Sequence, residues 1–179
     1  MKVLLDACVL FPTVLREILQ GAGAAGLFEP LWSERILGEW TSSAKKLGPG
    51  MDLVAEGEAA LFRAAFPRGH IYAQSAIESR LVLPDADDLH VLAVAIAGHA
   101  DAIVTFNASD FPRHMLAAEG IERRDPDGFL WELYSKHPEK MGAVLEAVRS
   151  RTEAISGREQ ELKALLKRAR LYRLAKAVA

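Results

Sequence analysis

Three aspartates follow short apolar runs or begin the helix after one, and they are the residues of this sequence best suited to chemistry. Asp6 comes directly after the run Lys2–Leu5. Asp88 lies in the first turn of a predicted helix, and Asp110 lies five residues beyond Thr105. If the apolar runs are strands of one parallel sheet, the loops after them open at the same edge, where such sheets bind ligands. We therefore expect the three carboxylates to converge.

Each acid also has a simpler interpretation. Asp85, Asp87 and Asp88 crowd a predicted helix N-terminus, where the unpaired amide groups favour acidic side chains. Helical phase separates them, because Asp88 begins the stripe Asp88, Leu92 and Ala95 that faces the sheet, whereas Asp85 is the cap. A carboxylate on that face is costly unless a cation or a hydrogen-bond donor meets it.

Asp6 is also expected to have a partner, because a charged residue at the end of a buried strand is rarely unpaired. No Lys, Arg or His occurs in the nine residues that follow it, so either a distant base or a metal ion pairs with it. Glu39 lies at the margin of the apolar face of a helix that Ser33 caps. Its phase fits a surface role and a site role equally well.

A group of carboxylates without Cys or His partners is an oxygen-only site, which suits Mg²⁺ or Mn²⁺. Zinc is disfavoured because Cys8 is the one cysteine and the five histidines form no closely spaced pair. Mg²⁺ coordinates phosphate oxygens, and two such ions activate water and stabilise the leaving oxygen. The inferred reaction is phosphodiester hydrolysis.

Other chemistries fit the sequence less well. It has no phosphate-binding G-x-x-x-x-G-K-[ST] loop and no G-x-S-x-G nucleophile elbow. The glycines of Gly21–Gly26 match G-x-G-x-x-G by letter only, because they follow a predicted helix instead of opening one. An aspartyl phosphatase would commonly show D-x-D at the first strand, and Asp6 is followed by Ala7 and Cys8.

The elements that must position these acids alternate between strand and helix. We expect strands over 2–5, 27–31, 101–105 and 121–124, with 80–83 again a short apolar run, and helices over 13–20, 51–66, 85–97 and 112–118, together with the one that Ser33 caps. This alternation predicts an α/β fold with a parallel sheet. After Pro126 only helices are expected, over 127–134, 139–149 and 156–178, the last opened by a capping box of Ser156 and Glu159.

Composition limits the protein class. The chain has 179 residues, of which 50% are hydrophobic and 26% charged, which is enough for one sizeable core. Residues 1–135 hold 11 basic and 19 acidic residues, whereas residues 136–179 hold 11 and 5, so an acidic body carries a basic tail. The lone Cys8, the absence of a signal peptide and the lack of any long apolar run predict a cytoplasmic protein without a membrane segment.

Four segments together make the chain resemble a PIN-domain ribonuclease. They are V-L-L-D-A-C-V-L-F-P at 3–12, S-E-R-I-L-G-E at 33–39, L-P-D-A-D-D-L-H-V-L-A-V-A at 83–95 and A-I-V-T-F-N-A-S-D-F-P at 102–112. The last two most resemble the branch of VapC-like toxins with an additional C-terminal helical region. The resemblance implies a catalytic domain over 1–130 in a three-layer α/β/α sandwich with a central parallel sheet, and a helical extension over 131–179.

The resemblance also implies Mg²⁺- or Mn²⁺-dependent cleavage of RNA and assigns residues to it. Asp6, Glu39 and Asp88 match the family's metal-binding acids, with Asp87 as an adjacent helper. At a fourth position, where the family often has an acid, this chain has Asn107, and Asp110 is expected to supply the missing charge. Thr105 and Asn107 would then orient water or phosphate.

Many relatives are toxins that a small antitoxin neutralises, and many form dimers. The resemblance therefore suggests RNA as substrate, an antitoxin as partner and a homodimer, with the basic tail gripping RNA or meeting the antitoxin. Two alternatives stay open: a PIN-like module that binds RNA or protein without cutting, and a DNA-directed nuclease of related architecture.

Overall fold

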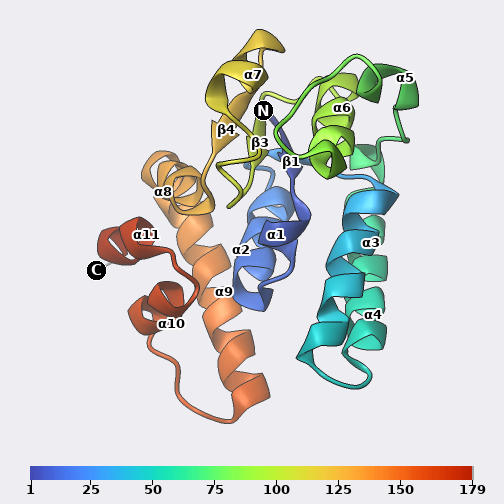
Figure 1. The fold of residues 1–179 in the computed structure, drawn as a ribbon. Helices are drawn as coiled ribbons and strands as arrows, with labels where there is room; N and C mark the ends of the chain where they lie inside the picture. Colours follow the sequence, from blue (N-terminus) through green and yellow to red (C-terminus); the bar gives the residue numbers. More distant parts are fainter. Residues whose placement is uncertain (179) are drawn as a thin grey trace. The chain divides into compact units, whose positions relative to one another are not determined.

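The computed structural model describes residues 1–178, which divide into two compact units (Figure 1). The first unit contains Met1–Phe11 and Phe28–Arg124, and the second contains Pro12–Leu27 and the chain from Asp125 onward. Within residues 1–178, no helix combines the length and the apolar character needed to cross a lipid bilayer.

A four-stranded parallel sheet forms the centre of the first unit. Its strands are β1 (Lys2–Leu5), β2 (Glu29–Leu31), β3 (Ala102–Val104) and β4 (Glu122–Arg124), in the order β2-β1-β3-β4. The apolar residues of β1 and all of β3 are buried, as continuous apolar runs in a parallel sheet require. The register aligns the last residue of β1, Leu5, with Val104 at the end of β3. The predicted α/β fold with a parallel sheet is confirmed.

Helices flank this sheet (Figure 1). They are α1 (Ala7–Leu10), α3 (Glu34–Ser43), α4 (Met51–Ala65), α5 (Ser75–Glu78), α6 (Leu89–Ala97) and α7 (Arg113–Ala118), with short 3-10 turns η1 (Ala44–Leu47), η2 (Pro67–Gly69) and η3 (Ala86–Asp88). Ser33 caps α3 as predicted, because its hydroxyl oxygen accepts a 3.2 Å hydrogen bond from the backbone N–H of Ile36. The apolar helix α6 buries nearly its whole length.

The apolar run over 80–83 does not form a strand. It lies in an irregular segment between α5 and η3, and only Leu83 of the run is buried. Val82 is 75% exposed, so the run has too little apolar surface facing the core to hold an edge strand against the sheet. The helix expected from residue 85 likewise begins as the 3-10 turn η3 and becomes α-helical at Leu89.

The second unit is helical: α2 (Thr13–Ala24), α8 (Pro126–Lys136), α9 (Pro138–Ser156), α10 (Leu162–Arg168) and α11 (Tyr172–Ala177). Helix α2 runs through Gly21 instead of ending there. A Cβ atom at Gly21 would lie 2.6 Å from Cγ1 of Val144, so this glycine permits the close packing of α2 against α9.

The long final helix expected over 156–178 is wrong. Ser156 ends α9, and Gly157 follows with a φ of 65°, the left-handed conformation that commonly terminates helices. The Ser156–Glu159 capping box therefore does not form. A second interruption separates α10 from α11, where Arg170 also has a positive φ of 63°. The C-terminal helices beyond the sheet were expected, but not their division.

Candidate metal centre

Asp6 lies where β1 passes into α1, and it is held on both sides. Its Oδ1 accepts a 2.8 Å hydrogen bond from the backbone N–H of Ala7, which makes Asp6 the N-cap of α1. Its Oδ2 accepts a 2.7 Å hydrogen bond from the hydroxyl of Thr105. The residue is 6% exposed, and no basic group of the described residues lies at ion-pair distance from it. Its charge is met by hydrogen-bond donors alone.

The turn after β3 carries a second group of polar side chains. The hydroxyl of Thr105 also accepts a 2.9 Å hydrogen bond from the backbone N–H of Asn107. The side-chain amide of Asn107 donates to Oδ2 of Asp110 at 2.7 Å and to Oδ2 of Asp88 at 3.3 Å. Asn107 therefore links the carboxylates of Asp88 and Asp110.

Three carboxylates gather beside this turn. Oxygens of Asp85, Asp88 and Asp110 all lie within 4.8 Å of one another, close enough to share a metal ion. Asp85 was expected to act only as a cap, and it does accept a 2.9 Å hydrogen bond from the N–H of Asp87. Residues i and i+3 of a 3-10 turn lie on the same side, so η3 places Asp85 next to Asp88 and leaves Asp87 elsewhere.

The mutual repulsion of these acids is visible in Asp88. Its pKa is raised from 3.8 to about 6, first by burial and then by the negative charges of Asp6, Asp85, Asp110 and Glu39. A carboxyl group surrounded by four others is a place where a bound cation gains much electrostatic energy.

A cavity of about 430 Å³ connects the predicted residues of three different elements. Asp6, Glu39 and Asp88 all line it, together with Ala7, Cys8, Phe11, Ser43, Lys46 and Asn107. Asp110 is not in the lining and reaches it through Asn107. Asp87 is exposed and belongs neither to this lining nor to the group of three acids.

Glu39 contacts His90, a residue that the sequence did not indicate. Its Oε1 lies 2.8 Å from Nε2 of His90 and 3.4 Å from Nε of Arg35. The His90 side chain is 3% exposed, and neither of its ring nitrogens makes a hydrogen bond of regular geometry among the described residues, so the contact with Glu39 is a close approach of Nε2 to the carboxylate. A lone histidine in the apolar segment 89–97 gives no sequence signal, because only the tertiary structure brings its side chain to Glu39, 51 residues earlier.

The donors present suit a hard divalent cation. They are carboxylate oxygens, with one amide beside them, and such ligands favour Mg²⁺ or Mn²⁺. The thiol of Cys8 is a poor ligand, because burial and then the charge of Asp6 raise its pKa to about 12. The residues fit a Mg²⁺ or Mn²⁺ ion and do not fit a thiolate-bound metal.

Comparison with known protein families identifies the family of this chain. The model of the family described as PIN domain matches residues 2–109, more than half of the chain. This chain belongs to the PIN domain family. Members of that family are typically metal-dependent nucleases, in agreement with the acidic group in this PIN domain. Comparisons with curated proteins and with solved structures found no match.

The matched region and the structural units of this PIN domain protein do not have the same limits. The match contains β1, β2 and β3 and all the candidate ligands except Asp110, which lies one residue beyond it. Strand β4 and helix α7 follow the match, although both belong to the same compact unit as the PIN-domain sheet. Asp110, α7 and β4 therefore belong to the first unit although they lie outside the matched region.

Proposed function

We propose that this protein is a divalent-metal-dependent endoribonuclease that hydrolyses RNA phosphodiester bonds in the cytoplasm. The observation that carries the proposal is the group of Asp85, Asp88 and Asp110, whose oxygens lie within 4.8 Å of one another beside the cavity of Asp6 and Glu39. The raised pKa of Asp88 supports it, because the site concentrates negative charge that a metal ion would neutralise.

The chain's own residues have distinct tasks in this reaction. Asp6, Asp88, Asp85 and Asp110 would hold Mg²⁺ or Mn²⁺, with Glu39 lining the same cavity. When bound, such an ion supplies an activated water and stabilises the leaving oxygen. Thr105 and the N–H of Ala7 fix both oxygens of Asp6, and Asn107 spaces Asp88 from Asp110.

Other polar groups of the cavity favour a phosphate substrate. Lys46 lines the cavity and makes no ion pair within residues 1–178, so its ammonium group is available to a phosphate oxygen.

Cleavage assays test the proposal directly. Labelled single-stranded RNA and DNA of the same sequence are incubated with the protein in Mg²⁺, in Mn²⁺ and in EDTA. We expect RNA to be cut only with metal, and Asp6→Asn or Asp88→Asn to reduce the rate by at least about 100-fold. Asp52→Asn, which removes an acid of α4 outside the site, is the matched control. Cleavage of DNA alone would favour the DNA-directed nuclease, and RNA binding without turnover would favour the binding module.

We further propose that the enzyme is the toxin of a toxin–antitoxin pair and forms a homodimer. The support is its resemblance to VapC-like toxins and the excess of basic over acidic residues at 136–179, which suits an acidic partner or RNA. Expression of the wild type should arrest bacterial growth, and expression of Asp6→Asn should not. Restored growth on co-expression of the neighbouring gene would identify the antitoxin, and light scattering would report the dimer.

A further inference from the structure

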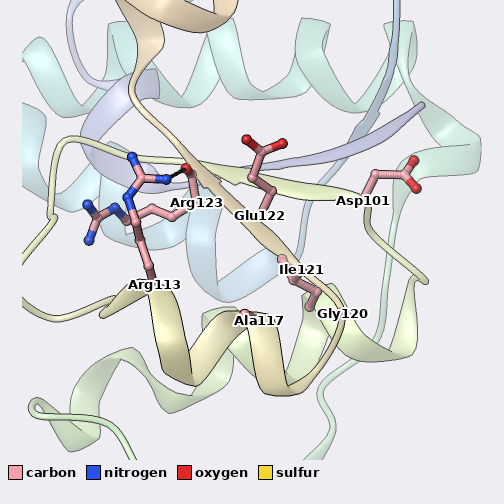
Figure 2. Close-up of a pocket in the computed structure, with 7 residues that line it drawn as sticks. All are labelled: Asp101, Arg113, Ala117, Gly120, Ile121, Glu122 and Arg123. Carbon is pink, nitrogen blue, oxygen red and sulfur yellow. Dashed lines mark hydrogen bonds between the residues drawn. The ribbon is translucent and has the colours of Figure 1, made fainter.

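A second cavity, of about 370 Å³, lies between α7 and β4 of the first unit. Its lining consists of Asp101, Arg113, Ala117, Gly120, Ile121, Glu122 and Arg123 (Figure 2). Figure 2 shows Arg113 and Arg123 toward one end of the lining and Glu122 and Asp101 toward the other, and Nη1 of Arg113 lies 3.4 Å from the carbonyl oxygen of Arg123. The cavity therefore has a positive end and a negative end.

Arg123 connects the positive end to the candidate metal centre. Its Nη1 donates hydrogen bonds to the carbonyl oxygens of Ala108, at 2.8 Å, and Phe111, at 2.9 Å. These carbonyls belong to the turn that carries Asn107 and Asp110. The arginine pair and the acidic group are therefore separated by a single turn of backbone.

The two arginines have no carboxylate partner within residues 1–178. Arg113 donates only to the carbonyl oxygen of Arg123, at a long 3.4 Å, and Arg123 donates only to the carbonyls of the turn. Four other arginines of the first unit pair with glutamates: Arg35 with Glu39, Arg63 with Glu34, Arg80 with Glu119, and Arg124 with Glu122. The remaining N–H groups of Arg113 and Arg123 are thus available to an anion.

The negative end of the cavity does not compensate this charge. Asp101 accepts a 2.7 Å hydrogen bond from the backbone N–H of Lys2, and Glu122 lies 3.6 Å from Arg124. Two neighbouring guanidinium groups repel each other, and an anion between them turns this repulsion into attraction. Guanidinium groups bind phosphate oxygens in a bidentate manner that suits such a bridge.

We propose that Arg113 and Arg123 bind a backbone phosphate of the RNA that flanks the phosphate at the acidic site. The inference rests on the proposed function, which supplies RNA as the ligand. An acidic site repels a polyanion before metal binds, so an RNA strand needs positive contacts beside it, and such contacts position the strand without reading its sequence.

Arg113→Gln is the test variant, because Arg123 also holds the turn of Asp110 and its replacement would disturb the metal site. Fluorescence anisotropy with labelled single-stranded RNA in EDTA measures binding without cleavage, over a series of KCl concentrations. We expect the Kd to rise about 5-fold and the slope of log Kd against log salt to fall by about 0.7, the contribution of one phosphate contact on a single strand.

Two variants serve as controls of charge. Arg68→Gln removes an exposed positive charge from η2, outside both cavities, and should leave the Kd within about 2-fold of the wild type. Glu122→Gln removes a negative charge from the same cavity as Arg113 and should tighten RNA binding. Arg113→Gln and Arg68→Gln change the net charge equally, so a higher Kd for Arg113→Gln alone would support a local phosphate contact over an effect of net charge.

The outcomes separate this inference from the proposed function. Equal Kd values for Arg113→Gln, Arg68→Gln and the wild type would overturn the phosphate site, even if the wild type cuts RNA in Mg²⁺. A wild type that binds no RNA in EDTA at low salt would also overturn it. Weaker binding by Arg113→Gln in a protein that never cuts RNA would support the phosphate site and contradict the nuclease.

Discussion

The hydroxyl group of Thr105 donates a 2.7 Å hydrogen bond to Oδ2 of Asp6, across a separation of 99 residues in the sequence. Both side chains are buried, and they lie at the ends of adjacent parallel strands. This hydrogen bond fixes the orientation of the Asp6 carboxylate relative to the sheet. Thr105 therefore orients the carboxylate of Asp6, and the role toward water or phosphate that the family resemblance implies for it stays a prediction.

Replacing Thr105 by Val should weaken metal binding and stability together. The isosteric Val removes the donor, so a buried carboxylate oxygen loses its hydrogen bond, which costs about 1–3 kcal/mol. Calorimetric titration with Mn²⁺ and urea unfolding measure the two effects. Thr105→Ser keeps the hydroxyl and should retain most of the metal affinity. Equal Mn²⁺ affinity in all three proteins would contradict the role of this bond.

Asp88 should make the metal-free wild type progressively less stable than Asp88→Asn as the pH rises from about 4 to 6. The pKa of Asp88 is about 6 when folded and 3.8 unperturbed, so the folded state binds more protons than the unfolded state in this interval. The stability supplied by the protonated form is lost as the pH passes through the folded pKa. Asp88→Asn should stabilise the metal-free protein at pH 7 by about 1 kcal/mol, after allowance for solvent screening of a partly exposed group.

Urea unfolding in EDTA across this pH range provides the measurement for Asp88, and Asp52→Asn provides the control acid. In Mn²⁺ the wild type should be more stable than Asp88→Asn, because the variant loses a metal ligand and with it the stabilisation by bound metal. A metal-free Asp88→Asn protein that is less stable than the wild type at pH 7 would show that repulsion does not dominate this site.

His90 should position Glu39. Its Nε2 lies 2.8 Å from Oε1 of Glu39, and its buried ring cannot leave α6. His90→Leu should lower the affinity for Mn²⁺ by about 10-fold, the usual effect of removing a partner that orients a ligand. His90→Gln, which keeps an N–H donor, should restore part of that affinity. Unfolding curves of both variants distinguish this loss from a general loss of stability.

In the second unit, Gly21→Ala should destabilise the protein by about 1–3 kcal/mol. The added Cβ would lie 2.6 Å from Cγ1 of Val144 and would push α2 away from α9. Gly142→Ala is the matched control, because a Cβ there meets nothing within 4 Å and should stabilise α9 by up to about 1 kcal/mol. Val144→Ala should rescue Gly21→Ala in thermal unfolding; failure of the rescue would point to a different contact.

Some parts of the site were predictable because they depend on local pattern alone. The continuous apolar runs of β1 and β3 indicate buried parallel strands, and a residue that ends such a strand lies at a predictable edge of the sheet. That reasoning placed Asp6 and Asp88 near each other, and the structure brings both to one cavity with Glu39. The run over 80–83 shows the limit of the same argument, since a short apolar run forms a strand only when a neighbouring strand accepts it.

Other parts depended on details that no pattern specifies. Asp85 and Asp88 form a group with Asp110 because the turn after β3 lies against η3, and the spacing of these acids in the sequence does not specify that contact. Gly157 indicates the end of a helix, whereas Ser156 and Glu159 indicate the start of one, and only the structure shows that α9 ends at this position. His90, Arg113 and Arg123 look like ordinary helix and strand residues until their neighbours are known.

The sequence by itself determined the strand runs, the alternation with helices and the presence of acids after them, because periodicity and strand ends are properties of neighbouring residues. Only the tertiary structure decided which acids share a cavity, which hydrogen bonds hold them and where, among residues 1–178, two arginines have no carboxylate partner. Those relationships join residues such as Asp6 and Thr105, 99 positions apart. Their geometry follows from strand order and helix packing, which depend on the energy of the whole fold.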